Sequence, residues 1–285
     1  MNLSLLRCHS FNRQGRTLFH SRLFFPREVR HDMQVVCRFA RTAAGHLDRG
    51  LSGPEELAAF KKRYETERRG HSTGDRIVAA FCELEHRRGF RYSWTDALLH
   101  SVELEFDNSV YYTIDETLEY LYGAADVIGL YIAAVFRLPP ETQRPAQMLG
   151  RAMEYLGLIR DLEEHNSFGR CYLPIGETTL ANLEYSTVME DAPEFMRYLN
   201  KQLDRYHEWH REAEGLYRLI PRRSLVPIKT AADMHAWTAR HIELNPFVVY
   251  ERKLEPSSVR VAWTAVGNML RPAGRLDREA QAAQH

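Results

Sequence analysis

A long apolar segment that begins at a helix-capping pattern most constrains the fold of this chain. Thr113 is followed three residues later by Glu116, a pairing in which each side chain satisfies a free backbone N–H group at a helix start. The segment that follows, residues 118–136, is mostly apolar and has about the length of a bilayer-spanning helix. It carries Glu119 and Asp126 and is followed by two prolines, so we predict a buried core helix rather than a membrane span.

Most of the remaining chain has the same helical period. Apolar residues recur every three or four positions, and no segment shows the alternation of a strand between hairpin turns. We predict helices over residues 29–47, 54–64, 75–86, 94–106, 113–136, 143–164, 193–219, 231–244 and 257–270. With 44% hydrophobic residues among 285, we expect one all-α domain over residues 1–285, with residues 1–15 and 272–285 as flexible tails.

Charge and cysteine usage narrow the class of protein. The 38 acidic residues balance the 38 basic residues, so nothing indicates a nucleic-acid partner. The apolar run at the N-terminus is too short for a signal peptide. The four cysteines have no spacing typical of a metal site or a disulfide framework, and we expect a cytoplasmic protein.

Charged side chains concentrate in the segment of residues 157–174. Asp161, Glu164 and His165 are three or four positions apart, so on a helix they share one face. Carboxylates held this closely repel one another unless a cation neutralises them, and Mg²⁺ prefers oxygen ligands. A solvated helix end ahead of the turn at Gly169 is the other interpretation, and the residues alone leave both open.

This segment resembles the second aspartate-rich motif of the squalene/phytoene synthase family, which reads N-I-x-R-D-x-x-E-D-x-x-x-G-R-x-Y-L-P. The residues that match in register, without a gap, are Arg160, Asp161, Glu164, Gly169, Arg170, Tyr172, Leu173 and Pro174. Three positions depart from the motif. Gly157 stands where the family has Asn, Glu154 where it has Gln, and His165 where it has the second Asp.

The resemblance extends over nearly the whole chain, but the first aspartate-rich motif is eroded. Residues 21–30 resemble the family's S-R-x-x-x-P-x-x-x-R, and residues 39–43 align with F-C-R-T-A. Family members then read D-D-x-x-D, where this chain has Ala44 and Gly45 and keeps only Asp48. Residues 120–129 and 245–250 also resemble family segments.

The resemblance implies an all-α isoprenoid-synthase helical bundle with a central cavity. In that family the two motifs face each other and hold Mg²⁺ ions, which bind the diphosphates of two prenyl diphosphates. Ionisation of an allylic diphosphate gives a carbocation. Metal ions and arginines must stabilise the leaving diphosphate, and apolar walls must keep water from the cation.

The motif matches also imply roles for individual residues. The expected metal ligands for Mg²⁺ are Asp48, Asp161, Glu164 and His165, although imidazole is a poor Mg²⁺ ligand. The expected diphosphate-binding residues are Arg22, Arg41, Arg160, Arg170 and Tyr172. The expected catalytic residues are Asp161, Asp48, Asp126 and Glu154, the last two orienting the acceptor or taking its proton. Asp126 either pairs with a nearby arginine or faces the cavity, and both remain open.

The missing carboxylates decide the function that we predict first. Because positions 44 and 165 lack carboxylates, the chain keeps enough of the motif residues to bind one diphosphate, but not enough to bind two. We therefore predict a prenyltransferase that ionises an allylic prenyl diphosphate and alkylates an aromatic or other hydrophobic acceptor in secondary metabolism, like the family offshoots that prenylate carbazole quinones. One alternative is a head-to-head phytoene or presqualene-type synthase, and another is a non-catalytic homologue that serves as a binding or assembly factor. Peripheral contact with a membrane remains an alternative, because the substrates of this family are often strongly hydrophobic.

Overall fold

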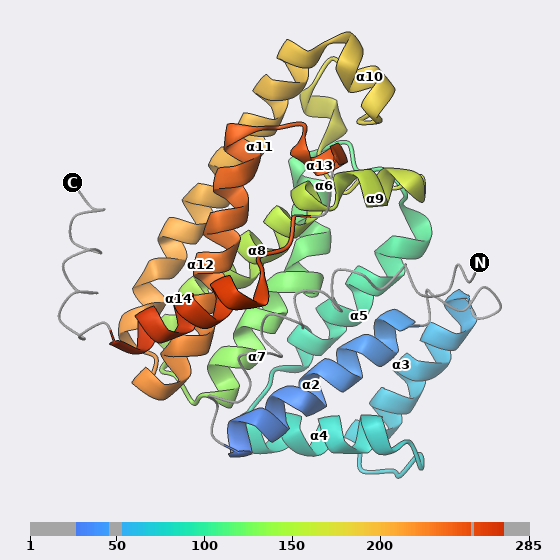
Figure 1. Ribbon diagram of the computed structural model, residues 1–285. Helices are drawn as coiled ribbons and strands as arrows, with labels where there is room; N and C mark the ends of the chain where they lie inside the picture. The colour runs from blue at the N-terminus through green and yellow to red at the C-terminus, as the bar shows by residue number, and fades with distance from the viewer. Residues whose placement is uncertain (1–26, 46–52, 252–253, 271–285) are drawn as a thin grey trace.

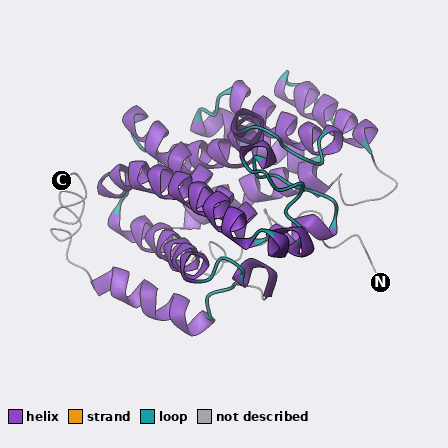
Figure 2. Cartoon of the chain, turned by 90° about the horizontal axis from the view of Figure 1, so that it is seen from above, coloured by secondary structure: helices purple, strands orange, loops and turns teal. Residues whose placement is uncertain are grey.

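The computed structural model describes residues 27–45, 53–251 and 254–270 as a bundle of helices (Figure 1). Within these ranges the only β-structure is one isolated bridge between Val110 and Cys171, and no strand is drawn in Figure 2. The all-α prediction is confirmed. The predicted tails lie outside the described residues, and the single domain over residues 1–285 stays a prediction.

The elements follow one another with short connections. In chain order they are α2 (Arg27–Gly45), α3 (Pro54–Arg68), α4 (Arg76–Arg88), α5 (Tyr92–Asp107), α6 (Ile114–Leu121), η3 (Tyr122–Asp126), α7 (Val127–Val135), η4 (Pro140–Thr142), α8 (Gln143–Arg160), α9 (Leu162–Ser167), η5 (Ile175–Glu177), α10 (Tyr185–Glu190), α11 (Ala192–Ala213), η6 (Glu214–Arg218), α12 (Arg222–Leu244), α13 (Val248–Glu251) and α14 (Ser258–Leu270).

The capping pattern forms as predicted. The Glu116 backbone N–H donates to Thr113 Oγ1 at 3.2 Å, and the Thr113 N–H donates to Glu116 Oε2 at 3.2 Å. The helix that starts here has a π-helical turn, η3, between α6 and α7. By length and composition the continuous helix Ile114–Val135 could cross a membrane, but most of it is buried inside the described part of the fold. Its burial supports the predicted core helix.

Glycines let α7 and α8 approach closely. A Cβ added at Gly129 would lie 2.0 Å from the carbonyl oxygen of Ala146, and one at Gly150 would lie 2.4 Å from that of Ala125. No side chain fits at either contact, so backbone packs directly against backbone. This close crossing fixes the position of α8, the helix that carries the aspartate-rich motif.

Several predicted helix boundaries were wrong, and two of the differences concern the candidate site. The helix predicted over residues 143–164 is interrupted at Asp161, where φ is −97° and ψ is 21°. Hydrophobic periodicity cannot detect a one-residue change of backbone angle. In addition, α12 starts at Arg222 rather than at residue 231, with Pro227 inside it. Pro227 is the sixth residue of α12, so it removes one backbone hydrogen bond in the second turn, and the helix continues past it.

Candidate active site

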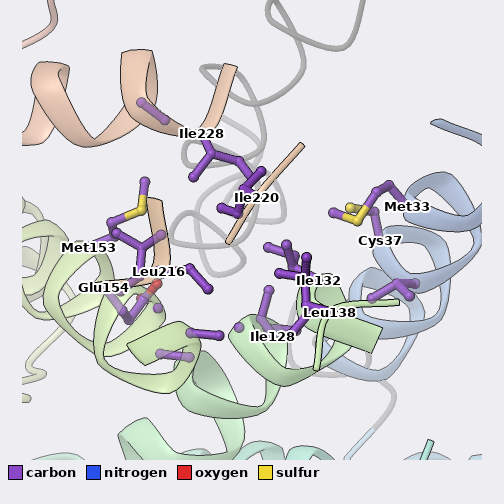
Figure 3. A pocket seen from close by; sticks show the side chains of 18 of the residues that line it. Met33, Cys37, Ile128, Ile132, Leu138, Met153, Glu154, Leu216, Ile220 and Ile228 are labelled. Atoms are coloured by element: carbon purple, nitrogen blue, oxygen red, sulfur yellow. The ribbon is translucent and has the colours of Figure 1, made fainter. Parts of the chain in front are cut away.

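An apolar cavity lies between α2, α7, α8, η6 and α12 (Figure 3). The empty space in and around it, open solvent included, is roughly 980 Å³. Aliphatic and methionine side chains form most of its wall, among them Met33, Ile128, Ile132, Met153, Leu216 and Ile228. Of the described residues that line it, Glu154 alone is acidic. Such a cavity suits a hydrocarbon chain with a polar group near Glu154.

The motif residues continue along α8 from this cavity. Glu154 is buried, and Arg160 and Asp161 follow two turns later at the end of the helix. Arg160 Nε donates to Asp161 Oδ1 at 2.9 Å, and its Nη2 donates to Oδ2 at 2.5 Å. Burial lowers the pKa of Arg160, but the hydrogen bonds and negative charges of Asp161 and Glu154 outweigh it and raise that pKa. The polar end of α8 is therefore a buried and charged region.

The predicted metal ligands do not by themselves form a metal site in the described part of the chain. Glu164 and His165 are half-buried on α9, and no group of three His, Cys, Asp or Glu side chains within the described ranges could hold a metal ion. The His165 ring packs edge-on against Tyr172, with 5.0 Å between ring centroids. Asp48 lies outside the described residues. The described side chains alone therefore do not fit Mg²⁺, and we assign no reaction step to it.

Arg170 and Tyr172 lie in a network around Glu105 of α5. Arg170 Nη2 donates to the Glu105 backbone oxygen at 2.9 Å, and Tyr172 Oη donates to Glu105 Oε2 at 3.2 Å. Tyr120 Oη donates to the other carboxylate oxygen at 3.1 Å. Burial, followed by the charge of Glu105, raises the pKa of Tyr172 well above its ordinary value. Tyr172 thus remains a hydrogen-bond donor, and its predicted diphosphate contact stays a prediction.

Asp126 pairs with an arginine, which is the first of the two alternatives that the sequence left open. Arg151 Nε donates to Asp126 Oδ1 at 3.0 Å, and Arg151 Nη2 donates to Oδ2. Burial raises the pKa of Asp126, and the guanidinium of Arg151 opposes that rise. Asp126 is fully buried and is not among the described residues that line the cavity. The ion pair joins η3 to α8, which is a structural role, and the predicted catalytic role gains no support from this geometry.

The first motif helix borders the other side of the cavity. Met33, Val36 and Cys37 of α2 line the wall, whereas Arg41 is exposed one turn further on. Burial raises the pKa of the Cys37 thiol, and the nearby charge of Arg41 opposes this rise. Arg41 therefore lies close to the cavity edge. Arg22 lies outside the described residues.

Sequence patterns missed three side chains near this region. Glu105 and Arg151 each bind a residue that we had singled out, but neither belongs to the motif pattern. His235 of α12 is buried near Arg160 and Asp161. Glu105 is one of several acidic residues on α5, so the sequence offered no signal that singled it out. The pairing of Arg151 with Asp126 depends on how η3 and α8 cross, which the sequence does not show.

Comparison with known proteins assigns the family. Residues 11–266 match the family described as squalene/phytoene synthase. The chain belongs to the squalene/phytoene synthase family. Members of this family are prenyltransferases, and the recognition made from the two motifs is confirmed at this level.

Curated relatives of this family member are phytoene synthases. The chain is 26% identical over 264 residues to the phytoene synthase of Mycobacterium tuberculosis, an alignment covering 88% of this chain and 85% of the relative. It is 23% identical over 257 residues to the 15-cis-phytoene synthase of Synechocystis, covering 84% and 76%.

Solved structures share the fold. The squalene synthase HpnC from Alicyclobacillus acidocaldarius has a TM-score of 0.72 at 19% identity, covering 84% of this chain and 94% of that one. A dehydrosqualene synthase has a TM-score of 0.75 at 16% identity, covering 91% and 95%. The predicted all-helical isoprenoid-synthase fold is confirmed.

Proposed function

We propose that this chain is a head-to-head prenyl synthase, which ionises one allylic prenyl diphosphate and couples it to a second one. The observation that carries the proposal is the apolar cavity lined by Glu154 of α8, the helix that ends at the Arg160–Asp161 pair. The phytoene synthase relatives, which align with most of the chain, support the same reaction. This was the alternative to the aromatic prenyltransferase that we predicted first.

The cavity would hold the prenyl chain and protect the cation. Each buried methylene group contributes about 0.8 kcal/mol, so a long chain binds well between α2, α7 and α8. The aliphatic wall excludes water, which would otherwise quench an allylic cation. We expect Arg160 at the end of α8 and Arg170 beyond α9 to donate to the departing diphosphate, since each guanidinium has five donors.

Transfer to an aromatic acceptor is a second candidate. It is favoured by Ala44, which supplies no carboxylate on α2 where the family's first motif has one. A second diphosphate in the same water-poor site adds several negative charges, and like charges held close there repel by several kcal/mol. A neutral acceptor avoids that repulsion. The third possibility, a non-catalytic homologue, requires that the chain neither couples two prenyl diphosphates nor prenylates an aromatic acceptor.

One experiment separates these functions. The purified chain is incubated with Mg²⁺ and geranyl, farnesyl or geranylgeranyl diphosphate, with or without a planar aromatic acceptor. Diphosphate release and the products are measured together, the latter by mass spectrometry. A coupled hydrocarbon or cyclopropyl diphosphate from the donor alone supports the proposal. Release that requires the aromatic acceptor supports the second candidate, and no release under any condition supports the non-catalytic homologue.

Peripheral membrane contact and a cytoplasmic location remain predictions. The last described helix, α14, presents Val259, Trp263, Val266 and Leu270 to solvent at helical spacing, and Trp263 is 72% exposed. An exposed apolar stripe of this kind suits the interface of a bilayer. We propose that α14 lies on the membrane surface, because substrates with long prenyl chains partition into lipid.

A further inference from the structure

Glu154 occupies the point where the aliphatic wall of the cavity meets the polar end of α8. Ala146, Gly150 and Met153 line the cavity from the preceding turns of the same helix. Glu154 is the last residue of α8 to line it, and Arg160 follows six residues later, about 9 Å further along the helix axis. The carboxylate therefore lies between the space for the prenyl chain and the end of α8 that we expect to bind its diphosphate.

The Glu154 side chain faces the cavity. In Figure 3 it extends from α8 toward the cavity beside Met153 and Leu216. Glu154 is only 4% exposed, so bulk water screens its charge weakly. The other described residues that line the cavity are aliphatic, sulfur-containing or glycine, and none of them is acidic or basic. A negative charge at this wall thus acts on whatever occupies the adjacent end of the cavity.

The charge of Glu154 acts on two neighbouring groups. Burial lowers the pKa of Arg160, but the hydrogen bonds and charge of Asp161, followed by the charge of Glu154, raise it. Burial raises the pKa of Tyr120 most, and the charges of Glu105 and Glu154 are among the further causes of that rise. Because the attraction between Arg160 and Glu154 is mutual, the guanidinium favours the ionised carboxylate.

We propose that Glu154 is a catalytic residue whose carboxylate stabilises the allylic cation formed from the donor. This inference rests on the proposed function. In the ionisation step the C–O bond of the donor breaks, and its electron pair leaves with the diphosphate. The positive charge stays on the allylic carbons at the head of the prenyl chain, between the aliphatic wall and Arg160. Glu154 neither forms a bond nor takes a proton in this step, and its negative charge attracts the cation.

This role differs from the contact with the acceptor that the sequence predicted for Glu154. The carboxylate acts before any acceptor reacts, so its role is the same for a second prenyl diphosphate and for an aromatic acceptor. A glutamine, which the family motif has at this position, would offer only the dipole of an amide. Opposite charges attract strongly in a water-poor site, and the cation exists only once the C–O bond begins to break. Glu154 should therefore raise kcat and have little effect on binding of the donor.

The kinetics of diphosphate release test this role. Glu154→Gln keeps the shape of the side chain without its charge, and Glu154→Asp keeps the charge on a shorter side chain. We expect Glu154→Gln to lower kcat by on the order of a hundredfold, with KM for farnesyl diphosphate changed by less than about threefold. Glu154→Asp should recover part of the lost kcat. Glu163→Gln, which removes an exposed carboxylate from α9, should keep the wild-type kcat.

Binding of a cationic analogue tests the same contact without turnover. Farnesyl dimethylamine is protonated at neutral pH and resembles the allylic cation, whereas farnesyl methyl ether is neutral and has a similar shape. In titration calorimetry, Glu154→Gln should weaken binding of the amine by on the order of tenfold and leave binding of the ether unchanged. If Glu154→Gln does not fold, the wild-type protein decides, because it should bind the amine more tightly than the ether.

Three outcomes would overturn the inference. The first is an unchanged kcat in a folded Glu154→Gln protein. The second is an equal change, or no change, in the binding of the amine and the ether by that variant, and an equal loss would give Glu154 a structural role. The third is equal affinity of the wild-type protein for both analogues. Failure of the proposed function looks different, because the wild-type protein would then release no diphosphate but would still bind the amine more tightly than the ether.

Discussion

Arg160 and Asp161 are neighbours in the chain, and Arg160 engages both carboxylate oxygens of Asp161 at the end of α8. The pair is mostly buried, with 12% and 6% of the two side chains exposed. A cation that binds Asp161 must compete with Arg160, and a diphosphate that binds Arg160 must compete with Asp161. Binding of a cation at Asp161 and binding of the diphosphate at Arg160 are therefore coupled through this ion pair.

Replacing Asp161 tests this region directly. We expect Asp161→Asn to lower turnover of an allylic prenyl diphosphate by on the order of a hundredfold, because the lost carboxylate no longer holds the Arg160 guanidinium in place to stabilise the leaving diphosphate. The measurement is the rate of diphosphate release at saturating donor. Glu163→Gln is the control, since Glu163 is an exposed carboxylate on the adjacent helix α9. Wild-type turnover in a folded Asp161→Asn protein would give Asp161 a purely structural role.

The cavity should set the preferred length of the donor. Ile132 lines the wall on α7, away from Glu154 in the view of Figure 3. A larger side chain at this position removes space for the distal isoprene units, so Ile132→Phe should favour geranyl over geranylgeranyl diphosphate by roughly tenfold in kcat/KM. Ile132→Leu conserves volume and should leave the preference unchanged. If the preference does not shift, the prenyl chain binds elsewhere.

The Asp126–Arg151 pair should contribute to stability. Asp126→Asn leaves the Arg151 guanidinium without its buried counter-charge, and we expect a loss of about 3–5 kcal/mol in the free energy of unfolding. Urea denaturation measures this loss, and a double variant with Arg151→Met should recover part of it. A folded Asp126→Asn protein with normal stability but strongly reduced turnover would restore the catalytic role predicted from the sequence.

Helix α14 should bind lipid through Trp263. Trp263→Ser is expected to weaken partition into phosphatidylglycerol-containing vesicles by roughly tenfold, since burying a large apolar side chain contributes about 1.5–3 kcal/mol. Sedimentation with vesicles measures the partition. Leu244→Ser is the matched control, because Leu244 is 76% exposed but lies at the end of α12. Equal binding of the wild-type protein and Trp263→Ser would exclude this surface.

Sequence patterns identified the helices and the motif because both are local. The capping pair at Thr113 and the apolar helix after it depend on residues a few positions apart, and both formed as predicted. The register of Arg160, Asp161 and Arg170 likewise follows from spacing within one segment. The partners of the motif residues do not follow from local spacing. Glu105, for example, contacts Tyr172 from a separate helix.

The position of His235 shows the same limit. Its spacing from Ala231 is visible in the sequence, but its closeness to Arg160 depends on how α12 packs on α8. We predicted an aromatic acceptor because two motif carboxylates are absent. That absence carries no information on the shape of the cavity or on the reactions of related proteins. Local patterns therefore predicted the fold and the motif better than the reaction.

Product analysis with a single substrate tests the central claim most directly. The wild-type protein is incubated with Mg²⁺ and farnesyl or geranylgeranyl diphosphate as the only organic substrate, and the extract is examined by mass spectrometry. We predict release of diphosphate together with a product that contains two prenyl units joined by a carbon–carbon bond. Release of diphosphate without any such product, or no release at all, would contradict head-to-head coupling.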